Sequence, residues 1–156
     1  MATPEERIAA LGMSVPEVVP PVAAYVPAVR TGDHVYVSGQ LPMVAGELAG
    51  TGKLGAEVTL ERGKELASTC ALNAIAALRA EVGELSLVNR IVKIVGFVAS
   101  DPSFHNQPQV LNGASELVGE VFGDAGVHAR SAVGVAALPL DAPVEVELVA
   151  EAARSE

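Results

Sequence analysis

The 156-residue chain carries only two long helical patterns, and its other periodic stretches have the spacing of strands. Thr59 and Gly83 are suited to cap the first pattern, and the second covers residues 108–122. Strands are predicted at residues 23–30, 34–39, 90–99, 130–139 and 143–150. Two helices can cover only one face of such a sheet, so the other face must meet solvent or another subunit. The pattern therefore predicts an α+β fold with a mixed sheet and two helices on one face.

The first 22 residues form a predicted N-terminal extension, and residues 23–156 are predicted to form a single domain. Thr3-Pro4-Glu5-Glu6 is a capping box that begins a short helix, and Gly12 can end it. Three prolines make residues 13–21 extended and irregular. Residues 42–56 contain four glycines and are expected to be a loop with room for a short strand.

The composition indicates an acidic protein that associates with itself. Half of the residues are hydrophobic, yet there are only three phenylalanines, two tyrosines and no tryptophan. A mean hydropathy of +0.39 implies more apolar surface than one small domain can bury, and so a subunit interface. The formal net charge is −9, and no lysine and arginine cluster occurs, so we expect no nucleic-acid or membrane partner.

A cytoplasmic location is expected from the cysteine content and the N-terminus. The single cysteine, Cys70, excludes a disulfide within the chain and fits a reducing compartment. The first residues lack the basic and apolar regions of a signal peptide, and no apolar run reaches the roughly 20 residues of a membrane helix.

The motifs of metal and nucleotide sites are absent from the sequence. His34, His105 and His128 lie far apart, and no paired histidine or cysteine spacing occurs, so they are interpreted as surface or packed side chains. The glycines between residues 46 and 55 lack the spacing of a phosphate-binding loop. We therefore expect neither a metal nor a cofactor.

Arg130 and Glu145 are the candidates for a reactive site. With a two-residue period, Arg130 shares a face with Ala132, Gly134 and Ala136, whereas Glu145 points away from its branched neighbours. If the branched residues of both strands face the core, the arginine and the glutamate meet on the opposite face, above small residues at which another chain could approach closely. Such a pair suits a small anionic substrate and a reacting water, although a surface charge pair is the simpler alternative.

Four other residues stand out, and each has an ordinary explanation. Tyr25 can anchor a strand end, and Ser38-Gly39 can form a bulge at a strand terminus. Asn112-Gly113 is unusual in a helical pattern because both residues are poor helix formers, which favours a special role near the helix start.

These residues together resemble a known family. Tyr25, Arg30-Thr31-Gly32 and Val37-Ser38-Gly39-Gln40-Leu41-Pro42 resemble the first hairpin of the RidA/YjgF family of reactive-intermediate deaminases, whose members are often labelled endoribonuclease L-PSP. Residues 129–133, Leu138-Pro139 and residues 144–147 resemble its closing signature. The resemblance covers residues 23–150, and the added N-terminal residues are similar to a longer bacterial subgroup.

The resemblance implies a chorismate-mutase-like homotrimer with sites at the subunit clefts, and hydrolysis of 2-imino acids to 2-oxo acids and ammonia without a cofactor. By position, Arg130 matches the carboxylate-binding arginine and Glu145 the glutamate that handles the water. The remaining pocket positions correspond to Tyr25, Ser38, Gly39 and Asn112. Ala132 stands where a cysteine is often found, so a thiol role there is excluded, while its backbone remains available to substrate.

Two other functions compete with this enzyme. A non-catalytic binding module could use Arg130 to hold a metabolite carboxylate on the same scaffold. The endoribonuclease of the family label is disfavoured by the acidic charge and by the few aromatic residues available for base stacking.

Overall fold

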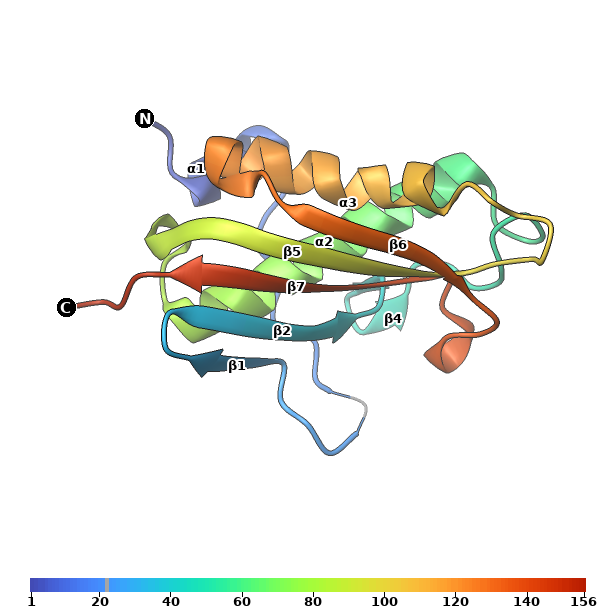
Figure 1. Cartoon of the computed structure of the whole chain (residues 1–156), viewed down its shortest axis with the longest axis horizontal. Coiled ribbons are helices and arrows are strands. Elements are labelled where there is room, and N and C mark those ends of the chain that lie inside the picture. The colour runs from blue at the N-terminus through green and yellow to red at the C-terminus, as the bar shows by residue number, and fades with distance from the viewer. Residues whose placement is uncertain (22) are drawn as a thin grey trace.

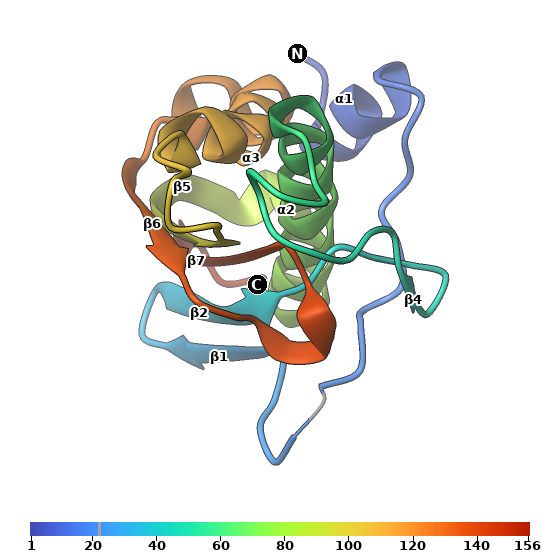
Figure 2. The same cartoon turned by 90° about the vertical axis from the view of Figure 1, so that its right-hand side faces the viewer.

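The computed structural model describes residues 1–21 and 23–156, and its centre is a five-stranded sheet with two long helices on one face (Figures 1 and 2). The strand order is β1-β2-β7-β5-β6. The sheet strands are β1 (Ala28–Thr31), β2 (His34–Gln40), β5 (Val88–Ala99), β6 (Ala129–Val135) and β7 (Val144–Ala152). The helices are α1 (Pro4–Ala10), α2 (Leu60–Val82) and α3 (Gln107–Phe122), and β3 (Met43–Val44) and β4 (Glu47–Leu48) form a small hairpin. The predicted α+β class with a mixed sheet is confirmed.

The helix ends follow the sequence signals. The Thr3 capping box forms with both of its hydrogen bonds, and Thr59 accepts a hydrogen bond from the backbone N–H of Arg62 at the start of α2. Gly83 ends α2 with φ of 94°, a left-handed conformation that favours glycine. The helices α1 and α2 therefore begin at the residues that the capping pattern predicts.

The core lies between α2 and the sheet. Alanines and aliphatic residues of α2, among them Ala71, Ala74 and Leu78, are fully buried against Ile94 and Val146. Small side chains on the helix let it lie close to the strands, which raises the packing density of this layer. Figure 2 shows both long helices on the same side of the sheet.

β5 separates the two C-terminal strands. The sequence pattern predicts a turn at residues 138–143 that joins two paired strands, so that their charged residues meet. In the structure, β6 instead pairs in parallel with β5, and β7 pairs antiparallel with both β5 and β2. The connection between β6 and β7, which contains a 3₁₀ turn at Pro139–Asp141, therefore crosses the end of β5. The expected cross-strand pairing of β6 with β7 is wrong because β5 inserts between them.

The N-terminal segment packs onto the helices before it reaches the sheet. Ile8 of α1 is buried in the core, and a carboxylate oxygen of Glu5 accepts a hydrogen bond from the N–H of Leu85 at 2.9 Å. The extended stretch that follows places Val15 and Val18 against the core. Figure 2 shows this stretch running past α2 and the β3–β4 hairpin toward β1.

None of the helices and strands formed by residues 1–21 and 23–156 covers the second face of the sheet. This face presents Val29, Tyr36 and Val133, whose exposed fractions lie between 45% and 53%. None of the helices among residues 1–21 and 23–156 is long and apolar enough to cross a membrane.

Gly113 explains the unusual dipeptide in α3. It lies well inside the helix rather than near its start, and a Cβ atom at this position would lie 1.9 Å from the carbonyl oxygen of Lys64 in α2. The two helices thus cross at a distance that only glycine permits.

Gly113→Ala should lower the free energy of unfolding by about 1–3 kcal/mol because the two helix backbones must separate. Gly119→Ala is the matched control, since that glycine belongs to the same helix and a Cβ there meets nothing within 4 Å. It should raise the free energy of unfolding by roughly 0.5–1 kcal/mol through helix propensity. Urea denaturation measures both changes, and equal effects would contradict the close crossing.

Candidate functional site

The structure divides the candidate site residues into two groups. Tyr25, Gly39 and Glu145 line one groove at the β2 and β7 side of the sheet, with Ser38 beside them. Arg130 and Asn112 lie together at the edge formed by β6 and α3. The strand order places β5 between β6 and β7, so the two groups are separate within one chain.

Glu145 occupies the middle of the first group. Glu145 is paired with Phe97 of the neighbouring strand β5, and its side chain lies on the face that the helices do not cover. Gly39 provides the space for it, because a Cβ at residue 39 would lie 2.8 Å from both Cδ and Oε1 of Glu145. The register of β2 against β7 shifts between Val37 and Gln40, which confirms the predicted bulge at Ser38-Gly39.

Ser38 fixes the loop that carries Tyr25. Its hydroxyl donates to the carbonyl oxygen of Val26 at 2.7 Å, and its backbone N–H donates to the carbonyl oxygen of Pro27 at 2.8 Å. The bulge therefore holds the Tyr25 loop at one end of the groove while it leaves room for the carboxylate of Glu145.

Burial raises the pKa of Glu145 above its ordinary value, and the negative charge of Glu147 contributes in the same direction. A carboxylate with a raised pKa is a stronger base than an ordinary glutamate once it is ionised. Beneath it, the fully buried Cys70 has a pKa raised well above the usual range by burial. Its thiol contacts the carbonyl oxygen of Val144 at 3.5 Å, as a packed structural cysteine does.

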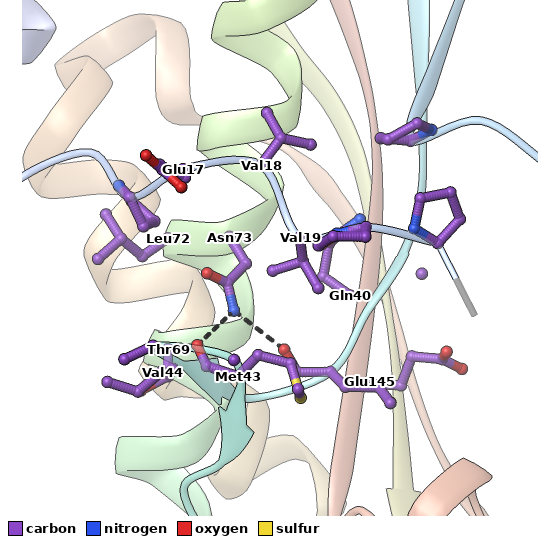
Figure 3. A pocket seen from close by; sticks show the side chains of 18 of the residues that line it. Glu17, Val18, Val19, Gln40, Met43, Val44, Thr69, Leu72, Asn73 and Glu145 are labelled. Atoms are coloured by element: carbon purple, nitrogen blue, oxygen red, sulfur yellow. Dashed lines mark hydrogen bonds between the residues drawn. The ribbon is translucent and has the colours of Figure 1, made fainter.

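The groove next to Glu145 has a volume of about 1310 Å³ (Figure 3). It lies between α2, the β2–β3 connection and the N-terminal segment. Figure 3 shows Glu145 at one end and Thr69, Leu72 and Val44 at the other. A small molecule with one end at Glu145 can therefore extend from the strands to α2.

Arg130 is held in place by α3. Its Nη1 donates to Oδ1 of Asn112 at 2.9 Å and to Oγ of Ser115 at 3.1 Å, and its Nη2 donates to the carbonyl oxygen of Pro108 at 3.3 Å. These contacts orient the planar guanidinium, which is suited to bind a carboxylate with two hydrogen bonds.

Two residues in this group were missed by the sequence interpretation. Ser115 and His128 make a hydrogen bond of 2.9 Å, and Nδ1 of His128 lies 2.6 Å from the carbonyl oxygen of Gly126. Because that carbonyl can only accept, Nδ1 donates to it, and in the neutral ring Nε2 accepts from the hydroxyl of Ser115. The spacing of Asn112 and Ser115, three residues apart on one helical face, was the available signal.

The prediction that Arg130 and Glu145 meet on one face is wrong for a single chain. Arg130 is aligned with the buried Ile94 and points to the helix side, whereas Glu145 points to the open side. Ala132 likewise packs against the core, so the open face of β6 carries Ser131 and Val133 in place of the expected small residues. The branched residues need not face the core here, because the polar side chains of α3 bind the arginine and the open face is itself apolar.

Comparisons with known proteins agree with this fold. The family described as "YjgF/chorismate mutase-like, putative endoribonuclease" matches residues 5–152. The chain belongs to this YjgF family. A curated relative, Protein TCP17 of Trypanosoma cruzi, is 46% identical over 144 residues, which cover 90% of this chain and 89% of the relative.

Two solved structures resemble this YjgF-family chain over nearly its whole length. A protein of unknown function from Agrobacterium tumefaciens is 43% identical with a TM-score of 0.91, and the match covers 96% of this chain and 92% of that one. A "putative endoribonuclease" from Shewanella oneidensis is 37% identical with a TM-score of 0.94, and the match covers 96% and 99%. Both likenesses include the N-terminal segment, because they extend beyond residues 23–156.

Among the residues that the structure describes, no group of three or more histidine, cysteine, aspartate and glutamate side chains is arranged to hold a metal ion.

Glu145→Gln should raise the urea midpoint at pH 7. Because the folded-state pKa of Glu145 is raised, its ionised form destabilises the folded protein when the pH exceeds that pKa. Below the ordinary glutamate pKa of about 4.3, the carboxyl is protonated in both states, so the difference should disappear near pH 4.

Glu57→Gln is the control with the opposite sign. The backbone N–H of Lys53 donates to Glu57 and lowers its pKa, so ionised Glu57 stabilises the folded state above the ordinary pKa. This variant should lower the urea midpoint at pH 7. A decrease in the midpoint for both variants would contradict the raised pKa of Glu145.

Proposed function

We propose that this protein hydrolyses reactive 2-imino acids, and their enamine tautomers, to 2-oxo acids and ammonia. The observation that carries the proposal is the pair of prepared groups, an oriented guanidinium at Arg130 and a half-buried carboxylate at Glu145 beside an open groove. The RidA/YjgF resemblance of these positions supports the same reaction.

In the proposed reaction, Arg130 binds the substrate carboxylate with two parallel hydrogen bonds and so places the adjacent carbon of the protonated imine, C=NH2⁺. Glu145 accepts a proton from a water molecule as the water oxygen bonds to that carbon and the C=N electron pair moves to nitrogen. Glu145 then returns the proton to the nitrogen. The C–N bond breaks as the hydroxyl oxygen forms the carbonyl group, and the hydroxyl proton leaves with ammonia as ammonium.

A complete site in this proposal needs two copies of the chain. Within one chain, Arg130 faces the helices and Glu145 faces the open side of the sheet, with β5 between their strands. We propose a homotrimer in which the open face of each chain meets a neighbour, so that Glu145 of one copy acts with Arg130 of the next. The exposed Val29, Tyr36 and Val133 on that face support such an interface.

Endoribonuclease activity is a second candidate, because the family description and the name of the Shewanella relative contain that word. The net charge of −9 and the absence of a lysine and arginine cluster count against a surface for RNA. RNA cleavage that disappears in both Arg130→Ala and Glu145→Gln would favour this candidate over imine hydrolysis.

Glu145→Gln should lower the turnover of 2-iminobutanoate by on the order of 100-fold, because it removes the general base and keeps the shape. Arg130→Ala should abolish both capture and turnover, since it removes charged hydrogen bonds worth about 1.5–3 kcal/mol each. The substrate is generated in situ, and its disappearance is followed with and without protein. Glu147→Gln, two residues along the same strand face, should retain turnover close to that of the unaltered protein.

Two outcomes would contradict the proposed reaction. Full turnover in Glu145→Gln would remove Glu145 from the chemistry. If the unaltered protein binds 2-oxobutanoate through Arg130 but hydrolyses no imine, the non-catalytic binding module replaces the enzyme.

Light scattering should give a particle of about three times the 15.9 kDa chain mass, because in the proposed homotrimer each chain buries its apolar open face against a neighbouring chain. A particle with the mass of one chain in dilute solution would contradict the interface.

Co-expression of Arg130→Ala with Glu145→Gln tests whether the site is shared. In trimers that contain both variants at random, about a quarter of the sites combine an intact Arg130 with an intact Glu145, so about a quarter of the turnover of the unaltered protein should return. The control is co-expression of Arg130→Ala with the variant that carries both Arg130→Ala and Glu145→Gln, and this mixture should restore no turnover. Equal turnover in the two mixtures would contradict a shared site.

A further inference from the structure

The groove beside Glu145 contains more apolar room than a 2-imino acid of four carbons requires. Its walls include Met13, Val18, Val19 and Leu72, and it extends from Glu145 to the far end shown in Figure 3. The outer wall comes from the N-terminal segment, and the inner wall from α2 and the β2–β3 connection. Pockets of this kind bind a ligand through apolar contacts and a few polar groups.

Two buried amides place hydrogen-bond acceptors at this groove. Asn73 and Gln40 are the buried polar side chains of the described core, with exposed fractions of 2% and 5%, and both line the groove. Nδ2 of Asn73 donates to the carbonyl oxygens of Leu41 and Met43 at 3.0 Å each (Figure 3). Nε2 of Gln40 donates to the carbonyl oxygen of Ser38 at 3.1 Å.

These bonds determine which end of each amide remains available. The main-chain carbonyls can only accept, so the amide nitrogens of Asn73 and Gln40 must face them. No donor from residues 1–21 or 23–156 reaches Oδ1 of Asn73 or Oε1 of Gln40. No fully buried side-chain nitrogen or oxygen of the described residues lacks a hydrogen-bond partner, so these two oxygens are accessible from the groove, where water or a ligand can donate to them.

The charges around the groove favour the same kind of ligand. Glu17 and Glu145 are its acidic lining residues, and no lysine or arginine is among the lining residues that the structure describes. Carboxylates and amide oxygens all accept hydrogen bonds, so N–H and O–H groups suit this surface better than additional acceptors.

We infer that the groove binds the substrate side chain, and that this side chain is bulky, mainly apolar and carries an N–H or O–H donor. The preferred substrates are then 2-imino acids with side chains the size of an indole or a phenol. This inference rests on the proposed function, because Glu145 places the reacting carbon at one end of the groove. The N-terminal segment, which supplies the outer wall, acts as a specificity determinant.

Binding of indole and indene tests the groove without the reaction. The two molecules have nearly the same shape, but only indole has an N–H donor, and neither has a carboxylate for Arg130. Both should perturb the NMR signals of Asn73 and Leu72, and indole should bind about fivefold more tightly, the contribution of one hydrogen bond. No perturbation of these signals by either molecule, or equal binding of both, would overturn the inference.

Two variants that fill the groove locate the binding. Thr69→Trp and Val44→Trp place an indole ring at the far end of the groove from two different elements, and each should weaken indole binding by about tenfold or more. Ala80→Trp is the control, since Ala80 is an exposed residue of α2 that does not line the groove. Unchanged binding in both folded groove variants would place indole elsewhere and overturn the inference.

Turnover separates this inference from the proposed function. The 2-imino acid of tryptophan should show a kcat/KM about tenfold or more above that of 2-iminobutanoate, because its ring is buried in the groove against α2. Thr69→Trp should remove this preference, whereas Ala80→Trp should retain it together with the hydrolysis of 2-iminobutanoate. If the unaltered protein hydrolyses both imines equally, the inference fails and the proposed function stands. If it hydrolyses neither, the proposed function fails, whereas the indole measurements still report on the groove.

Discussion

The packing of α2 and α3 on a single face of the sheet is the constraint on which the rest of the structure depends. Buried alanines on α2 and the close crossing at Gly113 bring this layer near the strands, and the two helices together supply about half of the core residues. With only two long helices, nothing in the described chain covers the second face. That face therefore keeps exposed apolar side chains, and it also carries the carboxylate of Glu145.

The same constraint divides the candidate site. α3 packs beside β6, so its polar side chains can bind the guanidinium of Arg130 on the helix side. Glu145 belongs to the strand on the other side of β5, and the alternation of side chains turns it to the open side. A chemistry that needs both groups thus connects the uncovered face to assembly. The proposed homotrimer would join the two half-sites and bury the apolar face in one step.

The environment of Glu145 links this strand to the N-terminal segment. The bulge at Ser38-Gly39 makes room for the carboxylate, and its partial burial raises its pKa. The segment before β1 forms the outer wall of the adjoining groove, where Asn73 and Gln40 present acceptor oxygens. The N-terminal segment, although it lies outside the sheet, can therefore influence which substrate side chain fits beside the carboxylate of Glu145.

The sequence alone determined features that depend on neighbouring residues. Capping at Thr3 and Thr59, the end of α2 at Gly83, the bulge at Ser38 and the α+β class were all predicted, because caps, turns and periodicity act over a few residues. The motif residues also placed the chain in its family. Only the tertiary structure decided that β5 inserts between β6 and β7, that Ser115, itself hydrogen-bonded to His128, binds Arg130, and that Arg130 and Glu145 face opposite ways. Strand order and helix docking depend on contacts between residues distant in sequence, and local periodicity has no information about which strands become neighbours.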